Sequence, residues 1–134
     1  MKEFNCDKVM EQIKCENKEQ IVCTPEKNRY GTSQFGIHNY RTCVDFMTGK
    51  VAFYKDIQIA HKGHRLKLVW EWDDENGNRI GQSTHSGCYN ARYPYNSPIE
   101  FQCDYLIGRT NIKVTFYAIS QQLNGWCPRI DNNK

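Results

Sequence analysis

Two short pairs of residues carry the side chains best suited to chemistry. His61 and His64 are separated by two residues, and His85 and Cys88 have the same spacing. Zinc accepts this mixture of nitrogen and sulfur ligands, and such pairs commonly form metal-ligand loops. Because a structural zinc site needs all its ligands within tetrahedral reach, the segment between the two pairs decides whether these side chains can meet.

That segment is predicted to be a β-hairpin. Residues 65–73 alternate between apolar and mostly charged side chains, which is typical of a strand buried on one face. Turn residues follow over 74–78, and the chain then returns as the partner strand. We expect Gly77 to adopt the left-handed conformation that closes a three-residue loop, so that Trp72 lies opposite Ile80.

This register limits the metal site. Counting back from the turn, His64 lies opposite Cys88, while His85 points to the other face. Two of the four candidate ligands would therefore converge, a third depends on the loop that carries His61, and the fourth is poorly placed. We expect no bound metal, with His61 and His64 as exposed turn residues and Cys88 in a disulfide.

The alternative for these residues is a metal-dependent or Cys/His hydrolase built around His64, His85 and Cys88. A catalytic thiolate needs a nearby base and surroundings that lower its pKa, and no third residue that would orient the histidine is evident beside the pair. The glycines form no phosphate-binding pattern, so no cofactor is predicted. A binding protein is favoured over an enzyme on these grounds.

The loop after the hairpin is the most suggestive binding surface. Its residue types are those in which binding energy concentrates, because they offer contact area and hydrogen bonds at a modest entropic cost. Pro94 would stiffen it, and loops on rigid β scaffolds often carry function. The alternative is that the tyrosines cap the open end of the sandwich. The predicted binding residues, for a protein or glycan partner, are Tyr89, Asn90, Arg92, Tyr93 and Tyr95.

Alternating patterns elsewhere predict a mainly β fold. We expect a single domain over 1–134, an antiparallel β-sandwich or open barrel of about six to seven strands, because no helix is long enough for a βαβ crossover. The core strands span 37–119, and an irregular tail covers 120–134. A short helix is predicted over 5–15 from apolar residues at helical spacing. Trp70 and Trp72 belong to the core.

Turn residues predict how the strands connect. Thr48 and Gly49 suit a tight hairpin between the strands at 40–46 and 51–59. A second hairpin is expected to pair 99–105 with 112–118, turning near Gly108. The polar, glycine-containing stretch from 25 to 36 is expected to be a loop.

Charge and hydropathy exclude several classes of partner. The 134-residue chain has a formal net charge of only +3, and its lysines and arginines form no basic run. Strong attraction to nucleic acid is therefore not implied. The apolar runs are too short for a transmembrane helix.

Cysteine usage favours an oxidising compartment. Seven cysteines are dispersed along the chain, which fits a disulfide-containing β domain with at least one free thiol. Residues 1–6 lack the apolar core of a secretory signal, as in a mature exported domain behind a new methionine or in a cytosolic protein. We expect a secreted, periplasmic or cell-surface binding module. The alternative is a cytoplasmic protein inhibitor from a mobile element or phage.

Overall fold

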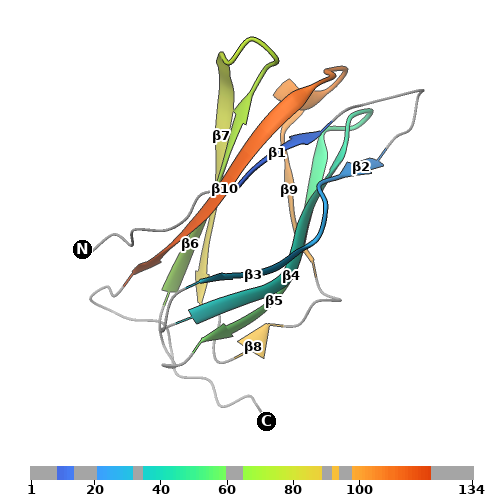
Figure 1. The fold of residues 1–134 in the computed structure, drawn as a ribbon. Coiled ribbons are helices and arrows are strands. Elements are labelled where there is room, and N and C mark those ends of the chain that lie inside the picture. Colours follow the sequence, from blue (N-terminus) through green and yellow to red (C-terminus); the bar gives the residue numbers. More distant parts are fainter. Residues whose placement is uncertain are drawn as a thin grey trace.

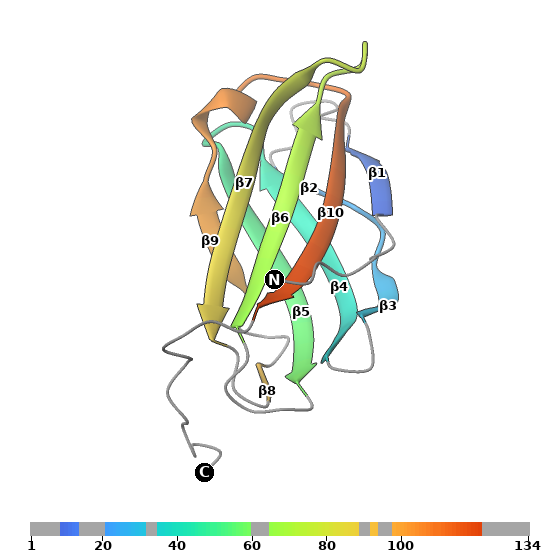
Figure 2. The ribbon, with the colours of Figure 1, turned by 90° about the vertical axis from the view of Figure 1, so that its left-hand side faces the viewer.

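The computed structural model describes residues 9–13, 21–31, 35–59, 65–88, 92–93 and 98–121. This part of the chain consists of antiparallel strands arranged in two facing layers (Figure 1, Figure 2). A single turn of 3-10 helix, η1 (Asp104–Leu106), is the one helical element among these residues. The strands are β1 (Val9–Ile13), β2 (Ile21–Cys23), β3 (Lys27–Gly31), β4 (Phe35–Asp45), β5 (Lys50–Ile59), β6 (Arg65–Asp73), β7 (Arg79–Cys88), β8 (Arg92–Tyr93), β9 (Ile99–Gln102) and β10 (Ile112–Gln121).

Each layer is one antiparallel sheet. The four-stranded sheet has the order β1-β10-β6-β7. In the six-stranded sheet, β4 pairs with β5, both β2 and β3 pair with the other side of β4, and both β8 and β9 pair with the other side of β5. The predicted antiparallel β-sandwich is confirmed.

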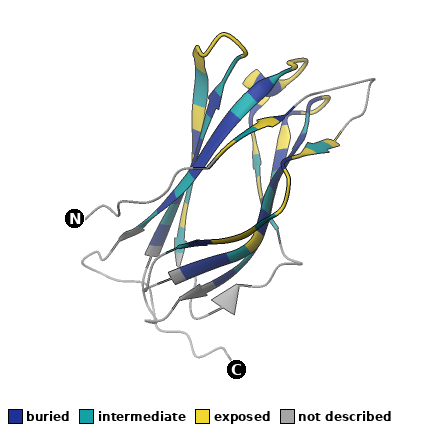
Figure 3. Cartoon of the chain, viewed as in Figure 1, coloured by how far each residue is buried: buried dark blue, intermediate teal, exposed yellow. Residues whose placement is uncertain are grey.

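The core lies between the inner faces of the two sheets, as the buried residues in Figure 3 show. On β10 every second residue, Val114, Phe116 and Ala118, is buried, and Thr115 between them is buried as well. Trp70 and Trp72 are fully buried, which confirms their predicted place in the core. The ring centroid of Phe116 is 5.4 Å from that of Trp70 and 4.7 Å from that of Phe53 on the opposite sheet. These aromatic contacts supply much of the apolar surface that closes the sandwich.

A set of buried polar groups connects Trp70 to the strands of the opposite sheet. The indole Nε1 of Trp70 donates to Thr42 Oγ1 at 3.2 Å, across the space between the sheets. The backbone N–H of Thr42 donates to Thr24 Oγ1 at 3.0 Å, and the Thr24 N–H returns a bond to the Thr42 carbonyl at 2.9 Å. The disulfide between Cys23 and Cys43 links β2 to β4 directly beside these threonines. The buried polar groups are thus satisfied where β2 joins the sheet.

The predicted N-terminal helix over 5–15 is wrong where the structure describes it. Residues 9–13 form strand β1, which pairs with β10 and places Ile13 opposite Ile112. Ile13 is buried and Met10 is 61% exposed. A helix of about three turns is marginal without tertiary support, whereas the edge of β10 offers a row of backbone partners.

Two predicted connections are also wrong. The expected loop over 25–36 contains strand β3, and with β1 and β8 it raises the strand number above the expected six to seven. Strands β9 and β10 do not form a hairpin, because β9 pairs with β5 and β10 with β6. The chain crosses from one sheet to the other through η1, and the Gly108 N–H bonds to the Phe46 carbonyl at 2.9 Å on the way. Two alternating strands joined by a short link have the same sequence pattern whether they pair with each other in a hairpin or belong to opposite sheets.

The central hairpin has the predicted turn and a different register beyond it. Gly77 has the expected positive φ of 87°, and Asp73 pairs with Arg79. Trp72, however, pairs with Gly81, so Ile80 is an extra residue that forms a β-bulge. Every later residue of β7 is therefore displaced by one position from the predicted pairing.

The two hairpin glycines provide a matched test of turn strain. Gly49 has a φ of 83°, and a Cβ there would lie 2.7 Å from the Cys103 carbonyl oxygen. Gly77 has a similar φ, and a Cβ there would have no neighbour within 4 Å. We expect Gly77→Ala to lower the free energy of unfolding by about 1 kcal/mol through the left-handed backbone alone. Gly49→Ala should lower it by about 2 kcal/mol more, because the clash is added. Urea unfolding of both variants measures the difference, and equal losses would contradict the close approach at Gly49.

Candidate functional site

The middle of the predicted binding loop is held by strand β8. Arg92 pairs with Gln58 and Tyr93 pairs with Ile57, so this part of the loop is joined by its backbone to β5. Tyr89, Asn90 and Tyr95 lie outside the described residues. The described part of the loop is thus an added edge of the six-stranded sheet, and the binding role of its side chains stays a prediction.

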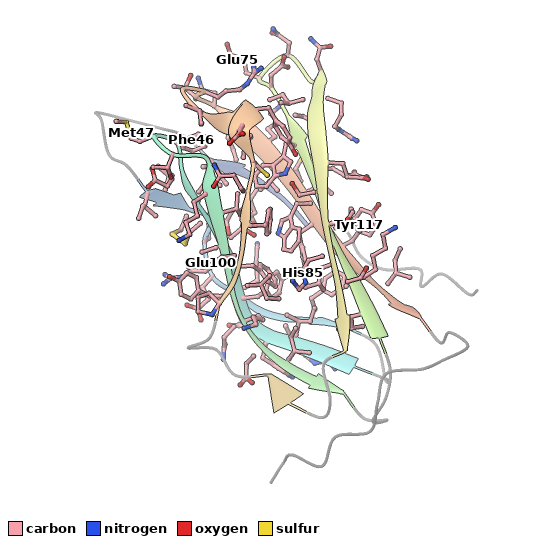
Figure 4. All side chains as sticks on the ribbon, turned by 180° about the vertical axis from the view of Figure 1, so that it is seen from behind. Phe46, Met47, Glu75, His85, Glu100 and Tyr117 are labelled. Atoms are coloured by element: carbon pink, nitrogen blue, oxygen red, sulfur yellow. A yellow bond between two sulfur atoms is a disulfide. The ribbon has the colours of Figure 1, made fainter. Side chains whose placement is uncertain are left out.

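The bulge at Ile80 places His85 where the sequence did not predict it. His85 pairs with Leu68, and it lies on β7 facing the space between the sheets (Figure 4). It is half-buried. The prediction that it points to the other face is therefore wrong, because one extra residue exchanges the two faces of a strand.

The predicted metal ligands are only partly described. Cys88 pairs with Arg65 instead of facing His64, and both His61 and His64 lie outside the described residues. Positions 85 and 88 are three apart on one strand, which places them on opposite faces. Within the described ranges, no group of three or more His, Cys, Asp or Glu residues could hold a metal.

A buried lysine is the unusual residue that the sequence reasoning missed. Lys55 lies on the inner face of β5 with no exposed surface, between the buried side chains of Phe53 and Ile57. Its position in the alternating apolar row of β5 was the available signal. Phe53 pairs with Ile99 of β9 and Ile57 pairs with Tyr93 of β8. Lys55 thus lies level with the gap between the two edge strands.

Burial controls the charge of Lys55 and of His85. Burial lowers the pKa of the Lys55 amine to about 8, although the adjacent Asp56 carboxylate acts in the opposite direction. Burial also lowers the pKa of His85 below its usual 6.5, and the positive charge of Lys55 lowers it further. A neutral imidazole therefore accompanies an amine that loses its proton near pH 8. Because the amine has no exposed surface, it cannot reach a substrate in this conformation.

A second polar cluster lies between the sheets nearer the turn of the central hairpin. Ser83 Oγ accepts a bond from the Trp72 indole at 2.9 Å and lies 3.0 Å from Cys103 Sγ and 3.1 Å from the Tyr105 hydroxyl. Cys103 is a buried free thiol. The pKa of the Tyr105 hydroxyl is raised, and burial is the largest cause. The Ser83 hydroxyl is fully engaged by these neighbours, so the cluster connects the two sheets and does not resemble an activated nucleophile.

A polar cleft of about 600 Å³ lies above this cluster, between the β6–β7 turn and the crossover after η1. Asn111 Nδ2 donates to Glu75 Oε1 at 3.1 Å and joins the two walls. Backbone N–H bonds from Asn78 and Asn76 lower the pKa of Asp74, which keeps it ionised. The cleft is lined by Asp74, Glu75, Asn76, Asp104, Tyr105, Ile107, Gly108, Arg109, Thr110 and Ile112. Its acids and its arginine suit a small polar ligand.

Comparison with known proteins relates this geometry to no family. Neither a protein-family model, nor a curated protein, nor a solved structure matches the chain. Its function is therefore inferred from its own residues.

The lowered pKa of Lys55 predicts a pH dependence of stability. Between pH 10.5 and about 8 the unfolded chain binds the lysine proton and the folded chain does not, so stability falls as the pH falls through this window. From pH 9.5 to 7.5 this group should remove roughly 2 kcal/mol from the free energy of unfolding. We expect Lys55→Met to abolish that slope. Tyr40, whose pKa burial raises to about 12, stays protonated over the same range in the folded chain.

Urea unfolding at several pH values measures the slope, and Lys50→Met is the matched control. Lys50 lies on the same strand and its side chain is 55% exposed. Its replacement should therefore give the same slope of stability against pH as the wild-type protein. Equal slopes in the wild type and in Lys55→Met would contradict the buried amine.

Proposed function

We propose that the protein is an exported binding module that recognises a protein surface or a glycan through Tyr89, Asn90, Arg92, Tyr93 and Tyr95. The observation that carries this proposal is the backbone pairing of Arg92 and Tyr93 with β5. A loop fixed at its middle to a packed sheet loses less conformational entropy on binding than a free loop. The residue types of the loop are those that commonly dominate interfaces.

Export of the protein is supported by its disulfide. Cys23 and Cys43 are directly opposite on β2 and β4 and are joined, whereas Cys103 is a free thiol. Disulfides persist mainly in oxidising compartments, which favours a secreted, periplasmic or cell-surface location over the cytoplasm. In the described part of the chain, none of the helical structure is long and apolar enough to span a membrane.

The geometry gives less support to a hydrolase. Positions 85 and 88 are three apart on one strand, a spacing that disfavours a thiolate–imidazole pair. The imidazole of His85 instead faces the core and has its pKa lowered by burial. Binding without chemistry is therefore the favoured function.

Replacing the described loop residues should weaken binding without changing the fold. We expect Arg92→Ala and Tyr93→Ala each to weaken partner binding by more than about tenfold, as at interface hot spots. Little change in the thermal midpoint is expected for Arg92→Ala, whereas position 93 pairs with the buried Ile57 and its midpoint is not a criterion. The partner is first identified by placing a photo-crosslinking amino acid at position 93 in the exported protein, and a glycan array tests the second class of ligand. Affinities for the identified partner are then measured by calorimetry.

Arg109→Ala serves as the matched control, because Arg109 is an exposed arginine beside the polar cleft. It should bind with wild-type affinity. Undiminished binding by both loop variants would refute the proposed site, and crosslinking from position 109 in place of 93 would move the site to the cleft.

The compartment can be tested by counting thiols. Mass spectrometry of denatured, unreduced protein alkylated as it is isolated from its native source should find a Cys23–Cys43 crosslinked peptide and one alkylated cysteine, with Cys103 the expected site. Seven alkylated cysteines would instead support the cytoplasmic inhibitor.

A further inference from the structure

Among the described strands, β7 is a sheet edge that lacks the usual protective features. It is the last strand of the four-stranded sheet, and none of the described residues pairs with its outer side. From Ile80 to Cys88 it carries no proline and no lysine, arginine, aspartate or glutamate. The one charge of β7, Arg79, precedes the bulge at Ile80. Every other described edge strand except the three-residue β2 carries a charge: Glu11 on β1, Lys27 and Arg29 on β3, Arg92 on β8, and Glu100 on β9.

Charges, prolines and short lengths normally prevent an edge from pairing with another chain. The bulge at Ile80 protects only the beginning of β7. The remaining residues form a continuous ladder with β6, from the pairing of Trp72 with Gly81 to that of Arg65 with Cys88. Within the described part of the chain, β7 thus offers a long, regular and uncharged edge for strand addition.

The hydrogen bonds of the hairpin turn show which backbone groups of β7 point away from β6, toward the edge of the sheet. The Asp74 N–H donates to the Asn78 carbonyl, which makes this a hydrogen-bonded pair. Bonded and non-bonded pairs alternate along an antiparallel ladder. Carrying the alternation through the bulge places the free N–H and C=O groups on Gln82, Thr84 and Ser86. The side chains of these three residues are exposed on the outer face of the sheet.

We propose that β7 pairs with β7 of a second copy of this chain, antiparallel and about a two-fold axis at Thr84. The two copies would form one continuous sheet across the interface. Thr84 faces Thr84 of the second copy, and Gln82 faces Ser86 of the second copy. All three residues then exchange backbone hydrogen bonds with the second copy.

The sequence of β7 is nearly self-complementary about this axis. On the inner face, Ser83 meets His85 of the second copy and Gly81 meets Gly87 of the second copy. The pairing opposes no like charges, and cross-strand threonine pairs are favourable. Gln82 already donates to Glu71 Oε2 of its own sheet at 3.3 Å, so its side chain lies against β6 and leaves the edge accessible. An isologous contact of this kind closes as a dimer, which favours a second copy over an unrelated strand.

The arrangement has a geometric consequence for the two binding loops. Position 88 of each copy lies opposite position 80 of the other. The two loops would leave the joined sheet on opposite sides of the axis, about 27 Å apart along the strands at roughly 3.4 Å per residue. The dimer itself does not depend on the proposed function of those loops.

Sedimentation equilibrium of the purified chain, from micromolar to high micromolar concentration, tests the proposal. We expect a monomer–dimer equilibrium in the wild type. Thr84→Lys places two like charges across the axis and should weaken dimerisation by at least about tenfold. Gln12→Lys adds the same charge to the opposite edge of the sheet, where Gln12 is exposed on β1, and should dimerise normally.

A mixture of two variants tests the register itself. Thr84→Lys and Thr84→Asp should each be monomeric with a wild-type thermal midpoint, and an equimolar mixture should form a heterodimer. Mass spectrometry under denaturing, non-reducing conditions separates this dimer from one linked by cysteines. A wild-type chain that stays monomeric at all concentrations, or a dimer that Thr84→Lys leaves intact, would overturn the proposal.

Discussion

The burial of two indole rings with both of their N–H groups satisfied is the constraint on which the fold depends. Trp70 and Trp72 supply the largest buried surfaces, but each brings a donor that is costly to leave unpaired. Thr42, from the opposite sheet, accepts from the first, and Ser83, on the neighbouring strand, accepts from the second. The separation and the register of the sheets are therefore fixed by hydrogen bonds as well as by apolar contact.

The two ends of the sandwich differ in the polar groups that are buried between the sheets. Ser83 also meets Cys103 and Tyr105, so the end near the central turn is closed by polar contacts between the sheets. At the level of the gap between β8 and β9, a lysine occupies an inner position that would ordinarily be apolar. Burying an ammonium is unfavourable, and proteins usually retain such costs where function requires them. The lysine lies two residues along β5 from the position that pairs with Tyr93 of the proposed binding loop.

Local sequence pattern predicted the fold class and the inner faces of the strands that carry the tryptophans and Phe53, and nonlocal contacts account for what it missed. Alternation identified the strands that contain Trp72 and Phe53, because a strand with one buried face has a period of two. It could not choose partners, so the predicted pairing of the strand that begins at Ile99 with the strand that begins at Ile112 is wrong. It also could not detect the extra residue at Ile80, which depends on how the ladder meets its turn. Most of the candidate loop lies outside the described residues, and its site therefore remains a proposal.

The bulge at Ile80 determines which side chains of β7 face the core. Without the bulge, the same residues would pair Trp72 with Ile80 and exchange the two sides of β7 from there on. Ser83 would leave the Trp72 indole without its acceptor, and Thr84 would enter the core in its place. Surface connections usually tolerate insertions and deletions. In this hairpin, homologous chains should either keep the bulge with its extra residue or lose the two together, because only then does this serine stay beside the second tryptophan.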